Sequence, residues 1–170
     1  MVWRPVAVAA VALVVAGCSG AGPRVVPKEY RQSIKQAAQE CDQLSPQLLA
    51  AQIDKESKFQ PDAQSKAGAQ GIAQFVPETW GRWGRDLNGD GTADPMNARE
   101  AIDAQARLMC FLIAQAELSG IDGNEVDLAL AAYNAGWSQV ERYDGIPPFK
   151  ETQSYVKSIR DNEKRYTFSG

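Results

Sequence analysis

The chain has 170 residues, of which 44% are hydrophobic, carries a formal net charge of −3 at pH 7 and contains no histidine. Its length and hydrophobic content allow one buried core and one compact domain, and an acidic balance without a long basic run argues against nucleic-acid binding. The lack of histidine excludes Ser-His and Cys-His nucleophile pairs, zinc-binding His motifs and imidazole acid–base chemistry, so catalysis would rest on carboxylates, hydroxyls, amides or lysines.

The first residues of the chain have the layout of a secretory signal peptide. Arg4 precedes an apolar stretch over residues 6–16, which is too short to span a membrane comfortably, and small residues follow. The letters VAGC, which end at Cys18, resemble the lipobox of bacterial lipoproteins, in which this cysteine becomes the acylated first residue. We therefore expect a signal peptide over residues 1–17 and a lipid anchor on Cys18, which would hold an exported protein on the outer face of the cytoplasmic membrane. The alternative is an ordinary signal peptide cut nearby, which would release a secreted protein.

Residues 18–27 predict a lipidated flexible tether, because the segment SGAGPRVVP is small and contains glycine and proline. The folded domain is then expected over residues 28–170. Export to an oxidising compartment permits a disulfide, and Cys41 and Cys110 form an even pair once Cys18 is set aside. We expect these two cysteines to be bonded; the alternative is two buried free thiols.

The remaining sequence is mainly α, with a small irregular or short-stranded segment over residues 60–75 that is rich in Gly, Gln, Ser and Ala. Ser45 as N-cap and Pro46 at the first position open the second helix. The apolar stripe of the longest helix, which includes Leu108 and Phe111, is so wide that we expect this helix to be central and buried. Helices are predicted over residues 28–42, 46–56, 77–83, 98–119, 124–133 and 151–165, with a shorter one after Gly136 and a polar loop over 86–97.

Glu56 lies near the end of the second predicted helix, and its direction is unusual for a carboxylate. With Leu49 at zero on a helical wheel of about 100° per residue, Ile53 lies near +40° and Glu56 near −20°, so Glu56 points toward the packed side. A carboxylate on an apolar face is costly to ionise, so its pKa should rise and it should hold a proton near neutral pH, as a glycosidic general acid requires. The alternative is a side chain at a frayed helix end, or one paired with Lys55 or Lys58.

Four short elements of the sequence occur in one order and register. The first is Glu-Ser at a helix end, and the second is a "GA-x-G-apolar-x-Q-x-x-P-x-T" segment. The third is "AAYNAG" over 131–136 and the fourth is "ETQSYV" over 151–156. Together they cover about residues 45–160 and resemble the signature of soluble-type lytic transglycosylases. The second segment consists of Gly68, Ala69, Gly71, Ile72, Ala73, Gln74, Pro77 and Thr79.

The resemblance implies a lysozyme-like helical domain that cleaves the β-1,4 bond between N-acetylmuramic acid and N-acetylglucosamine in peptidoglycan. Glu56 would protonate the leaving oxygen and then, as a carboxylate, take a proton from the muramoyl 6-hydroxyl, which leaves a 1,6-anhydro end. No catalytic cofactor is implied, and we expect a monomer whose partners are glycan strands and, through its anchor, the membrane. Two alternatives stay open: a hydrolytic muramidase of the same fold, which admits water, and a non-catalytic glycan-binding lipoprotein.

The resemblance also implies supporting roles, each with a structural alternative. Tyr133 would place its hydroxyl near Glu56, unless it is an aromatic that fills the core. Asn134 and Gln74 would bind N-acetyl or hydroxyl groups of the sugar, unless their amides tie loops to backbone. Ser57 would contact substrate or terminate its helix, and Glu151 would lie in the cleft or favour a helix N-terminus.

The segment DLNGDGTADPMN over residues 86–97 has the order D-x-N-x-D-G of an EF-hand-type loop, with the required glycine at Gly91. Its last position is Asn97 instead of the bidentate Glu, so the site is incomplete by that template. The segment predicts either a structural Ca²⁺ site of modest affinity or an Asx/Gly-rich turn that needs no ion. The predicted ligands are Asp86, Asn88, Asp90, the Thr92 carbonyl and Asp94.

Overall fold

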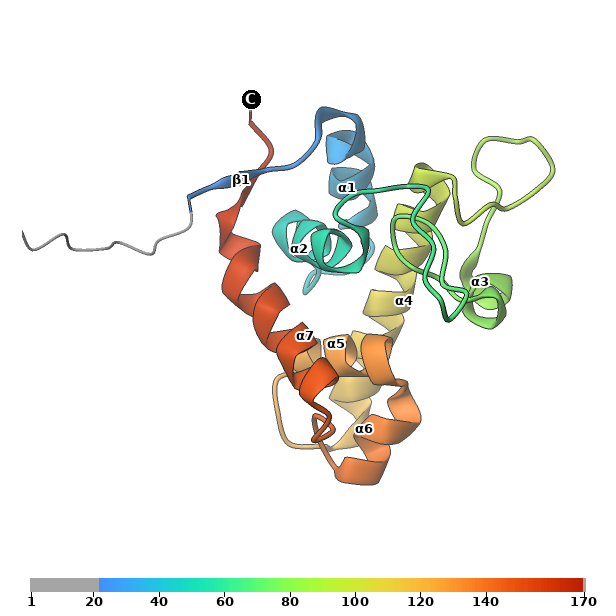
Figure 1. The fold of residues 1–170 in the computed structure, drawn as a ribbon. Coiled ribbons are helices and arrows are strands. Elements are labelled where there is room, and N and C mark those ends of the chain that lie inside the picture. Colours follow the sequence, from blue (N-terminus) through green and yellow to red (C-terminus); the bar gives the residue numbers. More distant parts are fainter. Residues whose placement is uncertain (1–21, 170) are drawn as a thin grey trace, which may run out of the picture.

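The structure is a computed structural model, and it describes residues 22–169 (Figure 1). It is mainly α, as the sequence predicts, and its only strands in this range form a two-stranded parallel sheet. The elements in chain order are β1 (Arg24–Val25), η1 (Lys28–Tyr30), α1 (Arg31–Ala37), α2 (Pro46–Ser57), α3 (Pro77–Trp83), α4 (Ala98–Ser119), α5 (Glu125–Ala135), α6 (Trp137–Tyr143), α7 (Lys150–Asn162), η2 (Glu163–Arg165) and β2 (Tyr166–Thr167).

The helix α4 is the central element of the core. The helices α1, α3 and α5 pack against α4 (Figure 1). The helix α7 packs against both α2 and α5. The side chains of Ile102, Met109 and Ile113 are buried on the inner face of α4, as predicted. The apolar stripe is narrower than predicted, because Phe111 is 53% exposed and Leu108, which packs against the core, is only partly buried and also lines a cleft. Phe111 instead packs its ring beside Trp83 of α3, at the surface.

The helix ends follow the local signals in the sequence. The side chain of Ser45 accepts a hydrogen bond from the Leu48 amide and Pro46 occupies the first position of α2, while Asn97 caps α4 in the same way. The first predicted helix is shorter than expected: a 3₁₀ turn precedes α1, which ends at Ala37. The segment over residues 38–44 follows α1 and contains Cys41, which is bonded to Cys110 of α4.

The N-terminal segment joins the fold earlier than the sequence predicts. Residues Arg24–Val25 pair with Tyr166–Thr167 as parallel strands, and the side chain of Val26 is fully buried. The Arg24 guanidinium also lies 2.6 Å from Asp54 of α2. Residues 24–26 are therefore part of the folded domain and not of the predicted tether over 18–27. The predicted signal peptide over 1–17 and Cys18 lie outside the described residues.

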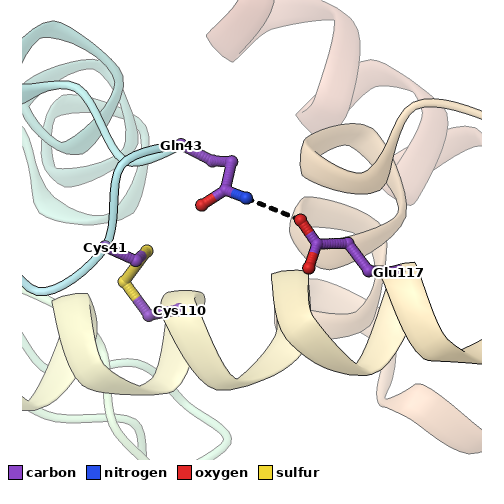
Figure 2. Close-up of a disulfide and its surroundings, with 4 residues drawn as sticks. All are labelled: Cys41, Gln43, Cys110 and Glu117. Carbon is purple, nitrogen blue, oxygen red and sulfur yellow. Dashed lines mark hydrogen bonds between the residues drawn. A yellow bond between two sulfur atoms is a disulfide. The ribbon is translucent and has the colours of Figure 1, made fainter.

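The predicted disulfide between Cys41 and Cys110 is confirmed. Figure 2 shows it crossing from the segment after α1 to α4, with a Cα–Cα distance of 5.8 Å. A second link runs beside it, in which the Gln43 amide donates to a carboxylate oxygen of Glu117 at 2.6 Å (Figure 2). In the chain-entropy model, a bridge that closes so long a loop stabilises the fold by up to about 4 kcal/mol. The cross-link therefore fixes the segment that leads into α2 against the central helix.

Within residues 22–169, none of the helices has the length and apolar character needed to cross a membrane.

Candidate active site

A cleft of about 370 Å³ opens where α2, α5 and α7 meet the irregular segment over residues 60–75. That segment is built from turns and isolated bridges, in which Gln70 pairs with both Gln64 and Phe75. The helices contribute Glu56 from α2, Thr79 from α3, Leu108 from α4, Tyr133 and Asn134 from α5, and Glu151 from α7. The irregular segment contributes Ser65, Ala67, Ala69, Gln74 and Phe75, and Val76 lines the cleft just before α3.

Glu56 is the only residue of α2 that lines this cleft, and its side chain is mostly covered by protein. Burial raises the pKa of Glu56 from its ordinary value of 4.5 to about 7. Three neighbours modify this pKa: a hydrogen bond from Tyr155 and the charge of Lys55 lower it, whereas the charge of Glu151 raises it. The carboxyl group is therefore divided between its protonated and ionised forms near neutral pH, which suits a group that must donate and then accept a proton.

The raised pKa of Glu56 predicts a stability effect that depends on pH. Because the folded-state pKa lies above the unfolded value, ionisation opposes folding, and the cost grows from about pH 4.5 to about pH 7. Glu56→Gln removes the ionisable group, so we expect this variant to be more stable than the parent by up to about 3 kcal/mol at pH 8. The gain should disappear at pH 4. Urea unfolding of both proteins at the two pH values measures it, and a difference that is equal at pH 4 and pH 8 would contradict the assigned shift.

The hydroxyl that touches Glu56 belongs to Tyr155 and not to Tyr133. Tyr155 is buried on α7 and donates a hydrogen bond to a carboxylate oxygen of Glu56. The hydroxyl of Tyr133 lies in the same cleft but donates to the backbone carbonyl of Ala73 at 2.9 Å. The Tyr133 hydroxyl therefore braces the cleft wall and does not donate to Glu56, although burial and the charge of Glu56 both raise the pKa of Tyr133. The element "ETQSYV" could have indicated this role, because its tyrosine, Tyr155, stands one helical turn after Glu151, which lines the cleft.

The other predicted site residues divide between the cleft and its supports. Asn134 lines the cleft and accepts a hydrogen bond from the Thr152 hydroxyl at 2.8 Å. Gln74 also lines the cleft, although its amide nitrogen donates to the carbonyls of residues 63 and 71, at 3.2 and 2.9 Å. Glu151 is exposed in the first turn of α7 and lines the cleft as well, so both of its predicted placements hold.

Ser57 is a helix-terminating residue. Its hydroxyl is buried, donates to the carbonyl of Ile72 at 2.7 Å and accepts from the amide of Gln60 at 3.2 Å. The next residue, Lys58, has a left-handed backbone conformation with φ of 59° and ends α2. Ser57 is not among the residues that line the cleft, so a substrate contact is not supported by its position.

The predicted ion-binding loop lies between α3 and α4. Within residues 22–169, no group of three or more acidic, histidine or cysteine side chains is placed to hold a metal ion. The Asp86 carboxylate instead accepts hydrogen bonds from the amides of Gly89 and Gly91, at 2.7 and 2.8 Å, and these bonds lower the pKa of Asp86. The Asp90 carboxylate accepts from the amide of Thr92 in the same way. These contacts are those of an Asx/Gly-rich turn, the second of the two arrangements that the sequence predicts for this segment.

The acid that anchors this loop was missed at the sequence level. Glu100 is almost completely buried in the first turn of α4. Its two carboxylate oxygens accept hydrogen bonds from the amide of Leu87, at 3.1 Å, and of Asp94, at 2.8 Å. Glu100 therefore joins both sides of the loop to the start of α4. An acid at the third position of a helix indicates a capping role, but the spacing alone does not name its partners.

Comparisons with known proteins agree with this arrangement. A family model described as the transglycosylase SLT domain matches residues 33–156. The chain is 31% identical over 147 residues to the peptidoglycan transglycosylase gp16 of Escherichia phage T7, covering 82% of this chain and 11% of that protein. It is 30% identical over 112 residues to the membrane-bound lytic murein transglycosylase F of Ectopseudomonas mendocina, covering 66% of this chain and 21% of that protein.

Solved structures share the fold. The 70 kDa soluble lytic transglycosylase of Escherichia coli superposes with a TM-score of 0.64 at 22% identity, over 81% of this chain and 24% of that one. An inactive mutant of the lytic transglycosylase Slt from Pseudomonas aeruginosa superposes with a TM-score of 0.62 at 25% identity, with the same coverage of 81% and 24%. The chain thus spans a quarter or less of the length of these relatives.

Proposed function

We propose, because the chain belongs to the transglycosylase SLT domain family, that it is a lytic transglycosylase that acts on the glycan strands of peptidoglycan. One observation carries the proposal: a single carboxyl group with a pKa of about 7 lies in a cleft, where a buried tyrosine hydroxyl holds it. The Glu-Ser, GA-x-G and A-Y-N-A-G elements, which lie far apart in the sequence, contribute Glu56, Gln74 and Asn134 to this cleft. The names of the relatives point to the same substrate.

In the proposed reaction, protonated Glu56 donates its proton to the glycosidic oxygen between N-acetylmuramic acid and N-acetylglucosamine. The C1–O bond breaks, and N-acetylglucosamine leaves with that proton on its 4-hydroxyl. The ionised Glu56 then takes the proton from the 6-hydroxyl of the muramoyl residue while this oxygen bonds to C1. The product ends in a 1,6-anhydro ring, Glu56 is protonated again and no water is consumed.

Product analysis tests this function directly. Purified peptidoglycan is digested with the protein, and the released muropeptides are examined by mass spectrometry. A lytic transglycosylase releases anhydro-muropeptides, each lighter by one water than the corresponding reducing product. Reducing ends alone would replace the proposal by a hydrolytic muramidase, and the lack of any release under these conditions would favour a non-catalytic glycan-binding protein.

We also propose that the protein is exported and held on the outer face of the cytoplasmic membrane by a lipid on Cys18. The signal-like N-terminus and the disulfide between Cys41 and Cys110 support export. The mass of the mature protein tests the anchor: a start at Cys18 with added acyl chains supports it. A mature protein without acyl chains would instead indicate a secreted form.

A structural Ca²⁺ in the loop over residues 86–97 is a separate proposal, which rests on its D-x-N-x-D-G order and its oxygen-only donors. The expected ligands are Asp86, Asn88, Asp90, the Thr92 carbonyl and Asp94. Ca²⁺ would hold the loop in place beside the cleft and would raise the melting temperature of chelator-treated protein, because it binds only the folded state. Calorimetric titration and thermal unfolding measure this, and the lack of both heat and shift at millimolar Ca²⁺ would contradict it.

A further inference from the structure

Gln52 is a fully buried polar residue on α2, one helical turn before Glu56. Its side-chain nitrogen donates to the hydroxyl oxygen of Tyr155 at 3.2 Å and lies 3.5 Å from the sulfur of Met109. Its side-chain oxygen has no hydrogen-bond partner among the described residues. A buried amide with an unsatisfied oxygen costs free energy, whereas an apolar side chain of the same size would not. A compensating benefit should therefore come from the bond to Tyr155.

The donors and acceptors in this cluster fix the direction of the hydrogen bonds. An amide NH₂ group only donates, so the oxygen of Tyr155 accepts from Gln52 and its own hydrogen must point elsewhere. That hydrogen points to the carboxylate of Glu56. The sulfur of Met109 is a weak acceptor, which fits an NH₂ group on that side of Gln52 and does not fit the amide oxygen. The chain of donation therefore runs from Gln52 through Tyr155 to Glu56.

We propose that Gln52 is a positioning residue, which fixes the Tyr155 hydroxyl as a donor to Glu56 and so stabilises the carboxylate form that must act as a base. The catalytic importance of Gln52 rests on the proposed function, because Glu56 serves as both acid and base only in the proposed transglycosylase reaction. A donor whose own oxygen accepts a hydrogen bond is polarised and donates more strongly. Gln52 thus opposes the burial that would otherwise keep Glu56 protonated.

The charged and titratable groups around Glu56 come from three helices. Lys55 of α2 lowers the pKa of Glu56, while α7 contributes Glu151, which raises it, and Tyr155, which lowers it. Tyr133 of α5 lines the same cleft as Glu56, and burial and the charge of Glu56 raise the pKa of Tyr133. Gln52 carries no charge and is hydrogen-bonded to Tyr155, not to Glu56. Its influence on Glu56 should therefore depend on the presence of Tyr155.

The test is a double-mutant cycle with the titration of Glu56 as its readout. Selective ¹³C labelling of glutamate lets NMR follow the Glu56 carboxyl against pH in the parent, Gln52→Met, Tyr155→Phe and the double variant. Methionine matches the shape of glutamine but lacks the donor. We expect Gln52→Met to raise the midpoint by about half a pH unit, since polarisation supplies up to about a third of the Tyr155 bond. Tyr155→Phe should raise it further.

In the Tyr155→Phe background, Gln52→Met should cause no additional rise, because its route to Glu56 is gone. Gln105→Met is the matched control: Gln105 is also fully buried, and neither of its side-chain polar atoms has a partner among the described residues. This control should leave the midpoint unchanged. An unchanged midpoint in Gln52→Met, or equal rises in both backgrounds, would overturn the proposal and reduce Gln52 to a packing role.

If Gln52→Met does not fold, Gln52→Asn takes its place in the cycle, because the shorter amide cannot reach the Tyr155 oxygen, and the same outcomes apply. The titration does not depend on activity, so the two proposals fail separately. A parent protein that releases no anhydro-muropeptides refutes the proposed function, even if the midpoints move as expected. A parent that releases them while Gln52→Met keeps its midpoint refutes only the role of Gln52.

Discussion

Glu56→Gln is expected to lower the rate of anhydro-muropeptide release at least about 1,000-fold, because one residue supplies both the acid and the base of the reaction. Glutamine has nearly the same shape, and its carbonyl oxygen still accepts from Tyr155, so the cleft should keep its geometry. The loss would then come from the missing proton transfers and not from altered packing. Initial rates on purified peptidoglycan, read by mass spectrometry of the soluble products, measure the effect.

Glu151→Gln is the matched control for this loss. It removes the same charge from the same cleft, but Glu151 is exposed in the first turn of α7. We expect its rate to stay within about 10-fold of the parent. The pH profile should move to lower pH, because the negative charge of Glu151 raises the pKa of Glu56. Equal activity of Glu56→Gln and the parent would remove the catalytic assignment.

The position of Glu56 could be predicted because it depends on local periodicity. A helical wheel that starts at Leu49 already turns Glu56 toward the packed side, and the structure buries Leu49 and Ile53 on that side. The start of α2 followed from its capping residue Ser45 for the same reason, since a cap acts within one turn. Such features can be predicted without knowing what packs against the helix.

Features that depend on packing between distant elements could not be predicted in this way. The sequence analysis expects the Tyr133 hydroxyl near Glu56 and does not assign Tyr155 a role, yet Tyr155 is the donor to Glu56 because α7 packs along α2. The pairing of Arg24–Val25 with Tyr166–Thr167 joins the two ends of the described chain, and nothing near residue 24 signals it. Glu100 illustrates the same limit, because its partners lie across a loop of the tertiary structure.

Gly71→Ala is expected to destabilise the fold strongly and to reduce activity with it. Gly71 has a φ of +78°, and a Cβ atom there would lie 1.8 Å from the backbone oxygen of Pro95. The left-handed conformation alone costs a non-glycine residue about 1–2 kcal/mol. The clash adds overpacking strain of about 1–3 kcal/mol, and because it meets backbone, no side-chain rotation relieves it. A total loss of about 2–5 kcal/mol follows.

Gly68→Ala separates these two causes. Gly68 lies in the same segment with a φ of +83°, but a Cβ atom there would meet nothing within 4 Å. The Gly68→Ala variant should therefore lose only about 1–2 kcal/mol of its free energy of unfolding, from the left-handed conformation, and should keep its activity. Chemical denaturation of both variants measures the difference, and similar losses would show that the contact with Pro95 is unimportant. If the prediction holds, the loop over 86–97 supports the cleft wall through this contact, because the backbone oxygen of Gly71 also accepts from the Gln74 side chain that lines the cleft.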